Sequence, residues 1–214
     1  METKNGMLGL TCLEKHPLGT PHSVEAIFEA IVGFGENSFM TTLYDRSSTC
    51  SVQHCDGRKR RNDKSFSESL VRIHADGATV KSSVQFLLEK YFKTSSIKCK
   101  TCNSKYLTRL VTITIQKLPE VLVIAIGDDG KIVAVNDKIT VQDAFYTLFA
   151  GAYFGALDEH FVALLKLGNE IYEYDGLNED GKLSVTTEKR LPYLYKQKNN
   201  QRKVRMLWYK KVLK

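Results

Sequence analysis

Strand-like patterns of apolar and polar side chains occupy most of the chain after residue 38, and the period of two that a half-buried β-strand requires is clearest in 105–119. The segments interpreted as strands are 38–49, 65–73, 105–119, 131–135, 138–141, 146–154, 160–167, 169–176, 183–187 and 203–212, of which 146–154 and 160–167 are mostly apolar. Segment 120–127 is apolar at nearly every position, which predicts a strand buried on both faces. Segment 189–203 is polar, and no strand is assigned to it.

Two other segments carry apolar residues at spacings of three and four, which predicts amphipathic helices. The first spans 21–32, where Thr20 can cap the helix, and the second spans 82–92 and begins at a serine cap. Two helices and roughly nine to eleven strands predict an α+β domain with a large antiparallel sheet over residues 20–214. Residues 1–19 show no period, and we expect them to form an irregular leader.

Candidate chemistry lies in the hairpins formed by 146–154, 160–167 and 169–176. His160 begins one of these strands, and Asp175 ends the next strand fifteen residues later. Antiparallel pairing brings the start of one strand beside the end of its partner, so an imidazole and a carboxylate can meet. Such a pair is the base and the orienting group of a nucleophilic triad. The alternative is structural, with a surface or core histidine and an aspartate that stabilises a turn.

Four of the five cysteines form two close pairs, CSVQHC at 50–55 and CKTC at 99–102. In a reducing compartment such pairs indicate a metal site rather than disulfides. Tetrahedral zinc takes four thiolate or imidazole ligands, and each close pair can span one edge of the tetrahedron. The sequence therefore predicts a structural zinc site whose ligands are Cys50, Cys55, Cys99 and Cys102. His54 competes with Cys55 as a ligand, and four unrelated cysteines are the alternative.

The composition, with 43% hydrophobic and 26% charged residues, is that of a globular protein. The sequence contains no run of about eighteen apolar residues, so no membrane span is predicted. Charges also interrupt the N-terminal segment where a signal peptide needs an apolar core. We therefore expect an intracellular protein, cytoplasmic or nuclear, without a membrane partner. The net charge of +7 and the basic run at 57–61 leave a zinc-ribbon nucleic-acid binder as an alternative, although no aromatic stacking platform accompanies the run.

The order of these elements over about residues 20–211 resembles the C-terminal two-thirds of a ubiquitin-specific protease catalytic domain. The matching segments are a QDAxEFLxxL-type helix at 22–31, the two cysteine pairs of a zinc ribbon, an LPxVLxIxL-type strand at 118–126, a stretch similar to YxLxGxxxHxGxxxxGHYxAYV at 145–165, a WYxxDD-type ending at 171–175 and an AYxLxYxR-type strand at 204–210. Each motif is loose, but the six occur in the order of the family.

The resemblance implies a papain-like palm with a large antiparallel sheet, joined to fingers that zinc stabilises. It implies that His160 is a general base, that Asp175 orients it, and that the partner is ubiquitin or a ubiquitin-like protein, cut at an isopeptide bond. The chemistry is consistent, because a cysteine nucleophile needs an imidazole to form its thiolate and a carboxylate to fix the tautomer.

The chain departs from the family pattern at the nucleophile. The family's GLxNxGNTCYMN box has no counterpart, and Cys12 is the remaining candidate upstream of the helix at 22–31. The segment between them is too short for the helical thumb of the family, so we expect the thumb to be absent or reduced. Asp158 and Glu159 also replace the glycines before the family's histidine. Two hypotheses follow: a thiol-dependent deubiquitinase, complete or truncated, or a non-catalytic module that binds ubiquitin or another protein.

Overall fold

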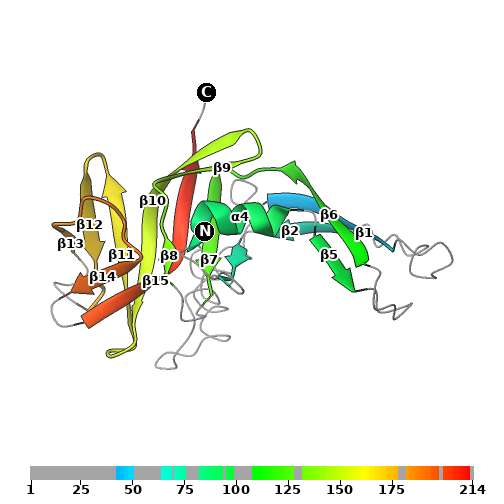
Figure 1. Cartoon of the computed structure of the whole chain (residues 1–214). Coiled ribbons are helices and arrows are strands. Elements are labelled where there is room, and N and C mark those ends of the chain that lie inside the picture. Colours follow the sequence, from blue (N-terminus) through cyan, green and yellow to red (C-terminus); the bar gives the residue numbers. More distant parts are fainter. Residues whose placement is uncertain are drawn as a thin grey trace, which may run out of the picture.

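The computed structural model describes residues 42–50, 64–68, 70–75, 82–93, 95–98, 108–127, 132–177, 182–197 and 200–212. In these ranges it contains fifteen strands and one helix, so the described part of the chain is mostly sheet (Figure 1). The strands form a nine-stranded main sheet, a four-stranded distal sheet and one separate strand pair. Within the same ranges, the helix is too short and too polar to cross a membrane.

The main sheet has the strand order β13-β12-β11-β10-β15-β7-β3, and β9 and β14 pair with β10 and β15 beside this path. Its strands are β3 (Val71–Ile73), β7 (Val121–Ile126), β9 (Lys138–Val141), β10 (Ala144–Gly155), β11 (His160–Leu167), β12 (Glu170–Tyr174), β13 (Leu183–Val185), β14 (Leu194–Gln197) and β15 (Asn200–Lys211). Every pairing is antiparallel except that of β3 with β7. The large antiparallel sheet that the alternation predicted is therefore present.

The helix, α4 (Val84–Phe92), packs against the main sheet, and its apolar residues at spacings of three and four are buried. The Ser83 hydroxyl accepts the Phe86 N–H at 3.2 Å, which is the serine cap that the sequence predicts. The amide of Gln85 fixes the helix to β9: its nitrogen donates to the Thr140 carbonyl at 3.0 Å, and its oxygen accepts the Thr140 N–H at 2.7 Å. Just before the helix, β4 (Ser82–Ser83) pairs with β8 (Val133–Ala134).

The distal sheet extends away from the main sheet on the far side of α4 (Figure 1). In spatial order its strands are β2 (Lys64–Glu68), β1 (Thr42–Cys50), β6 (Thr108–Lys117) and β5 (Ser95–Lys98). The base of this sheet is tied to the helix, because the Tyr91 hydroxyl of α4 donates to Glu68 of β2 at 2.9 Å. Tyr44 of β1, which is 5% exposed, meets the Phe92 ring edge-on.

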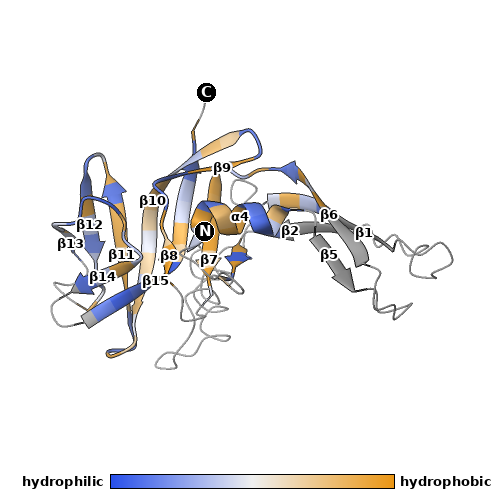
Figure 2. Cartoon of the chain, viewed as in Figure 1, coloured by the Kyte–Doolittle hydropathy of each residue, from blue (hydrophilic) through white to orange (hydrophobic). Residues whose placement is uncertain are grey.

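Both faces of the main sheet are apolar. The face against α4 carries the larger cluster of buried side chains, and the opposite face carries Leu70, Val123, Ala125, Ala152 and Met206. β7 lies inside this arrangement, with five of its six residues buried, and Figure 2 shows it hydrophobic along its length. The prediction of a strand buried on both faces is confirmed.

The pairing of β10 with β15 shifts register at two points. At the second shift, Arg205 is the extra residue on β15, inserted between Met206 and Val204, whose partners on β10 are adjacent residues. An extra residue reverses the faces of the side chains that follow, because side chains alternate with a period of two. Val204 and Arg202 therefore point to the face that carries α4, where both are buried.

Three buried tyrosines of the main sheet fix irregular connections to it. Each is fully buried and donates its hydroxyl proton to a backbone carbonyl that lies outside the strands. The pairs are Tyr146 with Pro119 at 2.7 Å, Tyr153 with Pro192 at 2.8 Å and Tyr209 with Asn136 at 2.9 Å. The tyrosines thereby satisfy carbonyls that the sheet ladders do not reach.

One sequence prediction is wrong in detail. Segment 65–73 is not one strand: β2 belongs to the distal sheet and β3 to the main sheet, and the chain passes from one sheet to the other between them. Segment 189–203, to which the sequence analysis assigned no strand, contains β14 and the first residues of β15, which form a hairpin. The helix predicted at 82–92 is confirmed as α4, whereas the one predicted at 21–32 lies outside the described residues.

Candidate active site

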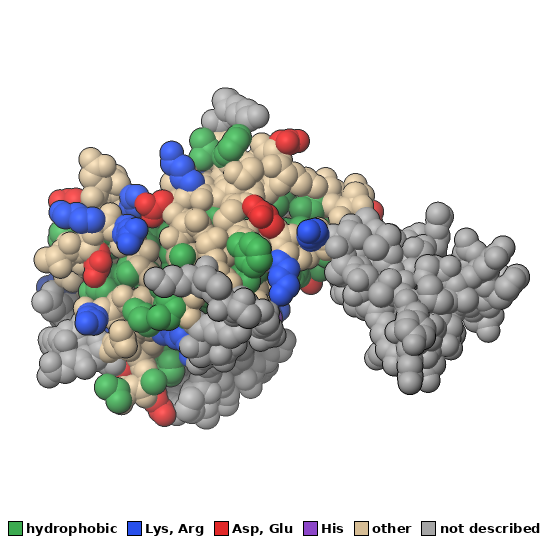
Figure 3. Space-filling view, viewed as in Figure 1, with side chains coloured by type: hydrophobic (Ala, Val, Ile, Leu, Met, Phe, Trp, Pro, Cys, Tyr) green, Lys and Arg blue, Asp and Glu red, His purple; other side chains and the backbone are tan. Residues whose placement is uncertain are grey.

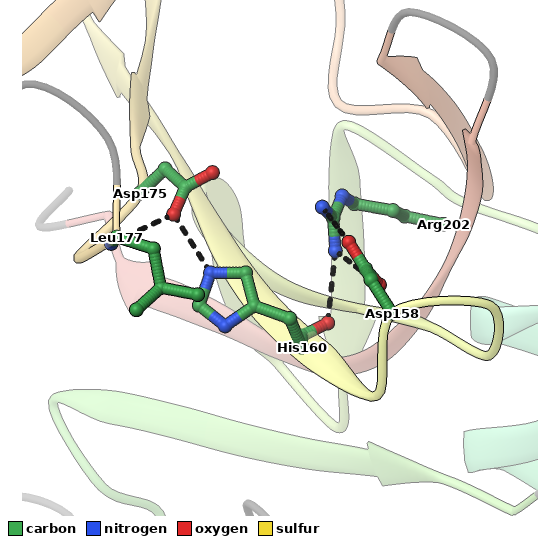
Figure 4. Close-up of polar contacts among 5 residues, drawn as sticks. All are labelled: Asp158, His160, Asp175, Leu177 and Arg202. Atoms are coloured by element: carbon green, nitrogen blue, oxygen red, sulfur yellow. Dashed lines mark hydrogen bonds and ion pairs between the residues drawn. The ribbon is translucent and has the colours of Figure 1, made fainter.

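The start of β11 lies beside the end of β12. Ala163 of β11 pairs with Tyr174 of β12, which places the first residues of β11 and the residue after β12 at the same end of the two strands. There, His160 Nε2 lies 2.7 Å from Asp175 Oδ1 (Figure 4). The spatial pairing that the hairpin spacing predicted is confirmed, and the catalytic role of the pair stays a prediction.

The carboxylate of this pair is held from a second direction. Asp175 Oδ1 also accepts the backbone N–H of Leu177 at 3.0 Å, the short-range bond by which an aspartate closes a turn onto its own backbone. The Asp175 side chain is only 5% exposed, so little water competes for these bonds. The backbone N–H of Leu177 therefore holds the carboxylate in place independently of the imidazole.

The hydrogen bond assigns different roles to the two nitrogens of His160. A carboxylate beside Nε2 favours the tautomer in which Nε2 carries the proton and Nδ1 carries the free electron pair. Figure 4 shows the second ring nitrogen facing away from Asp175. The side chain is 21% exposed, so a reactant can approach it. The arrangement can accept a proton at Nδ1 while the carboxylate stabilises the resulting imidazolium.

Sequence reasoning missed a buried arginine next to this pair. Arg202 of β15 is 3% exposed, and its guanidinium donates to the His160 carbonyl at 2.9 Å and to the Asp158 carboxylate. The sequence does carry a signal: Arg202 lies two residues from Val204, so in a strand the two side chains face the same side. It was not recognised because Arg202 lies in the stretch that was described only as a polar segment, 189–203.

A second polar pair lies on the same side of β12. Glu173 is 8% exposed and accepts a short hydrogen bond from the Tyr195 hydroxyl of β14. Burial, and then the bond to Glu173, raise the pKa of the Tyr195 phenol well above its ordinary value, so the phenol stays a donor at neutral pH. This bond ties β14 to β12, two residues before Asp175, and Tyr195 also lies in the segment that the sequence analysis described as polar.

The structure describes the approach to the predicted zinc site but not the site itself. Cys50 is the last residue of β1, while Cys55, Cys99 and Cys102 lie outside the described residues. β1 and β5 flank β6, and both Cys50 and Ile97 pair with Arg109. Both cysteine pairs are therefore entered from one end of the distal sheet. Elsewhere in the described ranges, no three potential ligands gather as they would around a metal ion.

The candidate nucleophile Cys12 and the basic run at 57–61 also lie outside the described residues. On the face seen in Figure 3, lysine and arginine side chains are interspersed with aspartate and glutamate over the main sheet and α4. The role of Cys12 and the nucleic-acid alternative both stay predictions.

Similarity to known proteins lies in the fold. No protein-family model and no curated protein sequence matches the chain. Among solved structures, the SAGA Ubp8/Sgf11/Sus1/Sgf73 DUB module bound to ubiquitin aldehyde is similar, with a TM-score of 0.51 and 16% identity over 82% of this chain and 42% of that one. A variant of the module bound to monoubiquitin has a TM-score of 0.56 and 15% identity over 88% and 47% of the two chains.

A third structure of the same DUB module has a TM-score of 0.53 and 14% identity, and the match covers 82% of this chain and 38% of that chain. The chain has a fold like that of a ubiquitin-specific protease. At these identities the likeness establishes the fold and nothing finer. The match spans less than half the length of each of the chains of this DUB module.

Proposed function

We propose that this chain is the palm and fingers of a thiol-dependent deubiquitinase, which hydrolyses the isopeptide bond at the C-terminus of ubiquitin or a ubiquitin-like protein. The observation that carries the proposal is the 2.7 Å bond between His160 Nε2 and Asp175 Oδ1, at one end of β11 and β12, in a chain with this fold. Two of the three solved structures named above are complexes of a DUB module with ubiquitin or its aldehyde, which supports ubiquitin as the partner.

In this mechanism Nδ1 of His160 takes the proton of a cysteine thiol, and Asp175 stabilises the imidazolium that results. The thiolate attacks the carbonyl carbon of the isopeptide bond, and the imidazolium returns its proton to the departing lysine amine. Water then hydrolyses the thioester, which frees the ubiquitin carboxylate and the thiol. Cys12 is the candidate nucleophile that this chain itself supplies.

The test is cleavage of a fluorogenic amide at the C-terminus of ubiquitin. His160→Ala is expected to lower kcat by about 10²–10⁴-fold, the usual contribution of a general base. Cys12→Ala abolishes turnover and labelling by a ubiquitin electrophile if Cys12 is the nucleophile. A folded wild-type chain that shows neither turnover nor labelling at high concentration would reject the enzyme proposal for this chain.

A non-catalytic ubiquitin-binding module is the second candidate. It is favoured by Glu159, which stands directly before His160 with a φ of 47°, where glycine would fit without strain. Glu159 and Asp158 also stand where the family that the sequence resembles has glycines before its histidine. This candidate predicts that ¹⁵N-labelled chain shows ubiquitin-dependent resonance shifts without any turnover. If no resonance shifts at millimolar ubiquitin, ubiquitin binding is rejected.

We also propose that Cys50, Cys55, Cys99 and Cys102 hold a structural zinc ion beyond the tip of the distal sheet. Support comes from β1 and β5, which run to the same end of that sheet and lead into the two cysteine pairs. Thiolate ligands suit zinc, which would fix a region that is distant from the main core. The test is the metal content of the purified chain. One zinc per chain is expected, lost in Cys99→Ser but retained in Cys12→Ser, and an equal metal content in the two variants would contradict this ligand set.

A further inference from the structure

We propose that Arg202 is a positioning residue for His160. It fixes the backbone of the turn at residues 156–159, from which the imidazole projects toward Asp175. The proposal rests on the proposed function only where it concerns turnover, because the effect on the imidazole itself can be measured in a chain without activity.

The register of three strands places the arginine within reach of the turn. On β10, Gly155 pairs with His160 of β11 on one side and with Arg202 of β15 on the other. The three residues therefore form one row across the sheet. Because the middle residue is glycine, it carries no side chain, and the long side chain of Arg202 can extend along the row toward β11 and the turn that precedes it.

The guanidinium holds the turn at two points. Its Nη1 donates to the His160 carbonyl at 2.9 Å, and Nη1 and Nη2 donate to the two carboxylate oxygens of Asp158 at 3.2 and 2.5 Å. Figure 4 shows this fork facing Asp158 and the backbone of His160. The Arg202 side chain is 4% exposed and that of Asp158 is 38% exposed, so the cation is buried and its partner reaches the surface.

These two contacts bracket a strained residue. Glu159 lies between Asp158 and His160, and its φ of 47° is in the left-handed region that residues other than glycine rarely adopt. Such a conformation persists when the surroundings determine it more strongly than the local preference does. A single guanidinium that binds the side chain before Glu159 and the carbonyl after it supplies that determination.

The consequence is directional control of the imidazole. If the Arg202 guanidinium is removed, Glu159 can relax to a negative φ, and the backbone that leads into His160 changes direction. The Nε2–Asp175 bond then weakens or is lost, although neither of its partners has been altered. The geometry of the guanidinium matters, because lysine lacks the planar pair of donors that binds both carboxylate oxygens side by side.

The experiment compares Arg202→Met and R202K with the matched control Arg205→Met. Arg205 lies three residues further on the same strand, and its guanidinium lies 5.8 Å from the centre of the Phe154 ring. The first readout is the NMR signal of the His160 imidazole, in which the ¹⁵N shifts and the Nε2 proton report the tautomer and the bond to Asp175. The second readout is the separation of kcat from KM with the ubiquitin amide.

We expect R202M to shift the His160 imidazole signals and to lower kcat by about 10–100-fold with KM nearly unchanged, as small misplacements of catalytic groups do. R202K is expected to fall between R202M and the wild type, and R205M to match the wild type. Adding Glu159→Gly to R202M is expected to restore kcat about fivefold, because glycine adopts the left-handed turn without strain.

Imidazole signals in folded R202M that match those of the wild type would overturn the proposal, as would equal changes in R202M and R205M. If R202M does not fold, the imidazole signals of R202K decide in the same way. A chain that lacks turnover but shows shifted His160 signals in R202M rejects the proposed function and supports the positioning role. An active chain whose turnover R202M leaves unchanged supports the proposed function and rejects the positioning role of Arg202.

Discussion

His160 and Leu177 donate to the same oxygen of Asp175, the first from its ring and the second from its backbone. One atom thus joins the imidazole to the turn that follows β12. Asn can accept both hydrogen bonds at the same position but lacks the negative charge that stabilises an imidazolium. Substitutions at this residue therefore separate geometry from charge.

Asp175→Asn is expected to leave the free energy of unfolding within about 1 kcal/mol of the wild type, while Asp175→Ala costs about 1–3 kcal/mol because both donors lose their acceptor. For turnover, D175N is expected to reduce kcat by about 10²–10⁴-fold, since the imidazolium loses its counter-charge. Urea unfolding and kinetics with the ubiquitin amide measure the two effects. Equal stability of D175N and D175A would show that the shared oxygen is not what holds the turn.

The pair formed by Arg202 and Asp158 is expected to respond asymmetrically. Asp158→Asn leaves a buried cation with a weaker partner and should cost about 2 kcal/mol of unfolding free energy, between the values of exposed and buried pairs. Arg202→Met leaves a carboxylate that can reach water, so it should cost less.

Adding R202M to D158N should recover stability, and a double-mutant cycle by urea unfolding measures the coupling. Additive losses would contradict a buried ion pair. The unrelated change Arg205→Met provides the baseline, because Arg205 contacts the ring of Phe154 rather than the turn before His160.

Alkaline pH is expected to unfold the chain steeply. Burial raises the pKa of the phenols of Tyr146, Tyr153 and Tyr209 above the ordinary value near 10. Below about pH 10 both states keep these protons; above it the unfolded state releases them while the folded state retains them, so stability falls as pH rises. Each such tyrosine removes about 1.4 kcal/mol per pH unit in that window. The check is urea unfolding between pH 8 and pH 11 together with phenolate absorbance, and a stability that does not change across this range would refute the burial of these phenols.

Removing one tyrosine hydroxyl from the core is expected to be costlier than removing one from the surface. Tyr209→Phe removes a fully buried hydroxyl and leaves the partly buried carbonyl of Asn136 without this donor, which should cost about 1 kcal/mol or more. Tyr172→Phe removes an exposed bond to Glu170 and should change stability by less than about 0.5 kcal/mol. Thermal unfolding of the two variants gives the comparison, and equal losses would mean that the hydroxyl of Tyr209 contributes no more than a surface contact.

The sequence predicted what depends on periodicity and short spacing. The hairpins around His160 and Asp175 were predictable because each turn joins strands that are neighbours in sequence and in space. The residues of β7 are apolar at every position instead of alternating with polar ones, which correctly predicted that both faces of the strand are buried. The helix at α4 was predictable from its apolar spacing and its serine cap.

The parts that were missed depend on distant segments. β2 and β3 continue one alternating pattern, and only their partners, β1 and β7, show that they belong to different sheets. β14 is polar along much of its length because it lies beside a single strand, β15, at the side of the main sheet. Arg202 could not be placed next to His160, because that contact joins residues forty-two positions apart.

The extra residue Arg205 has a consequence for how this chain tolerates length changes. On β15, even-numbered residues before Arg205 face the core that odd-numbered residues face after it. The strand can therefore present both Val204 and Leu207 to the same core. Most substitutions at Arg205 keep this count. Deleting the residue would not: one missing position would exchange inside for outside along half of the strand, and Arg202 would turn away from the imidazole while every remaining amino acid stayed the same.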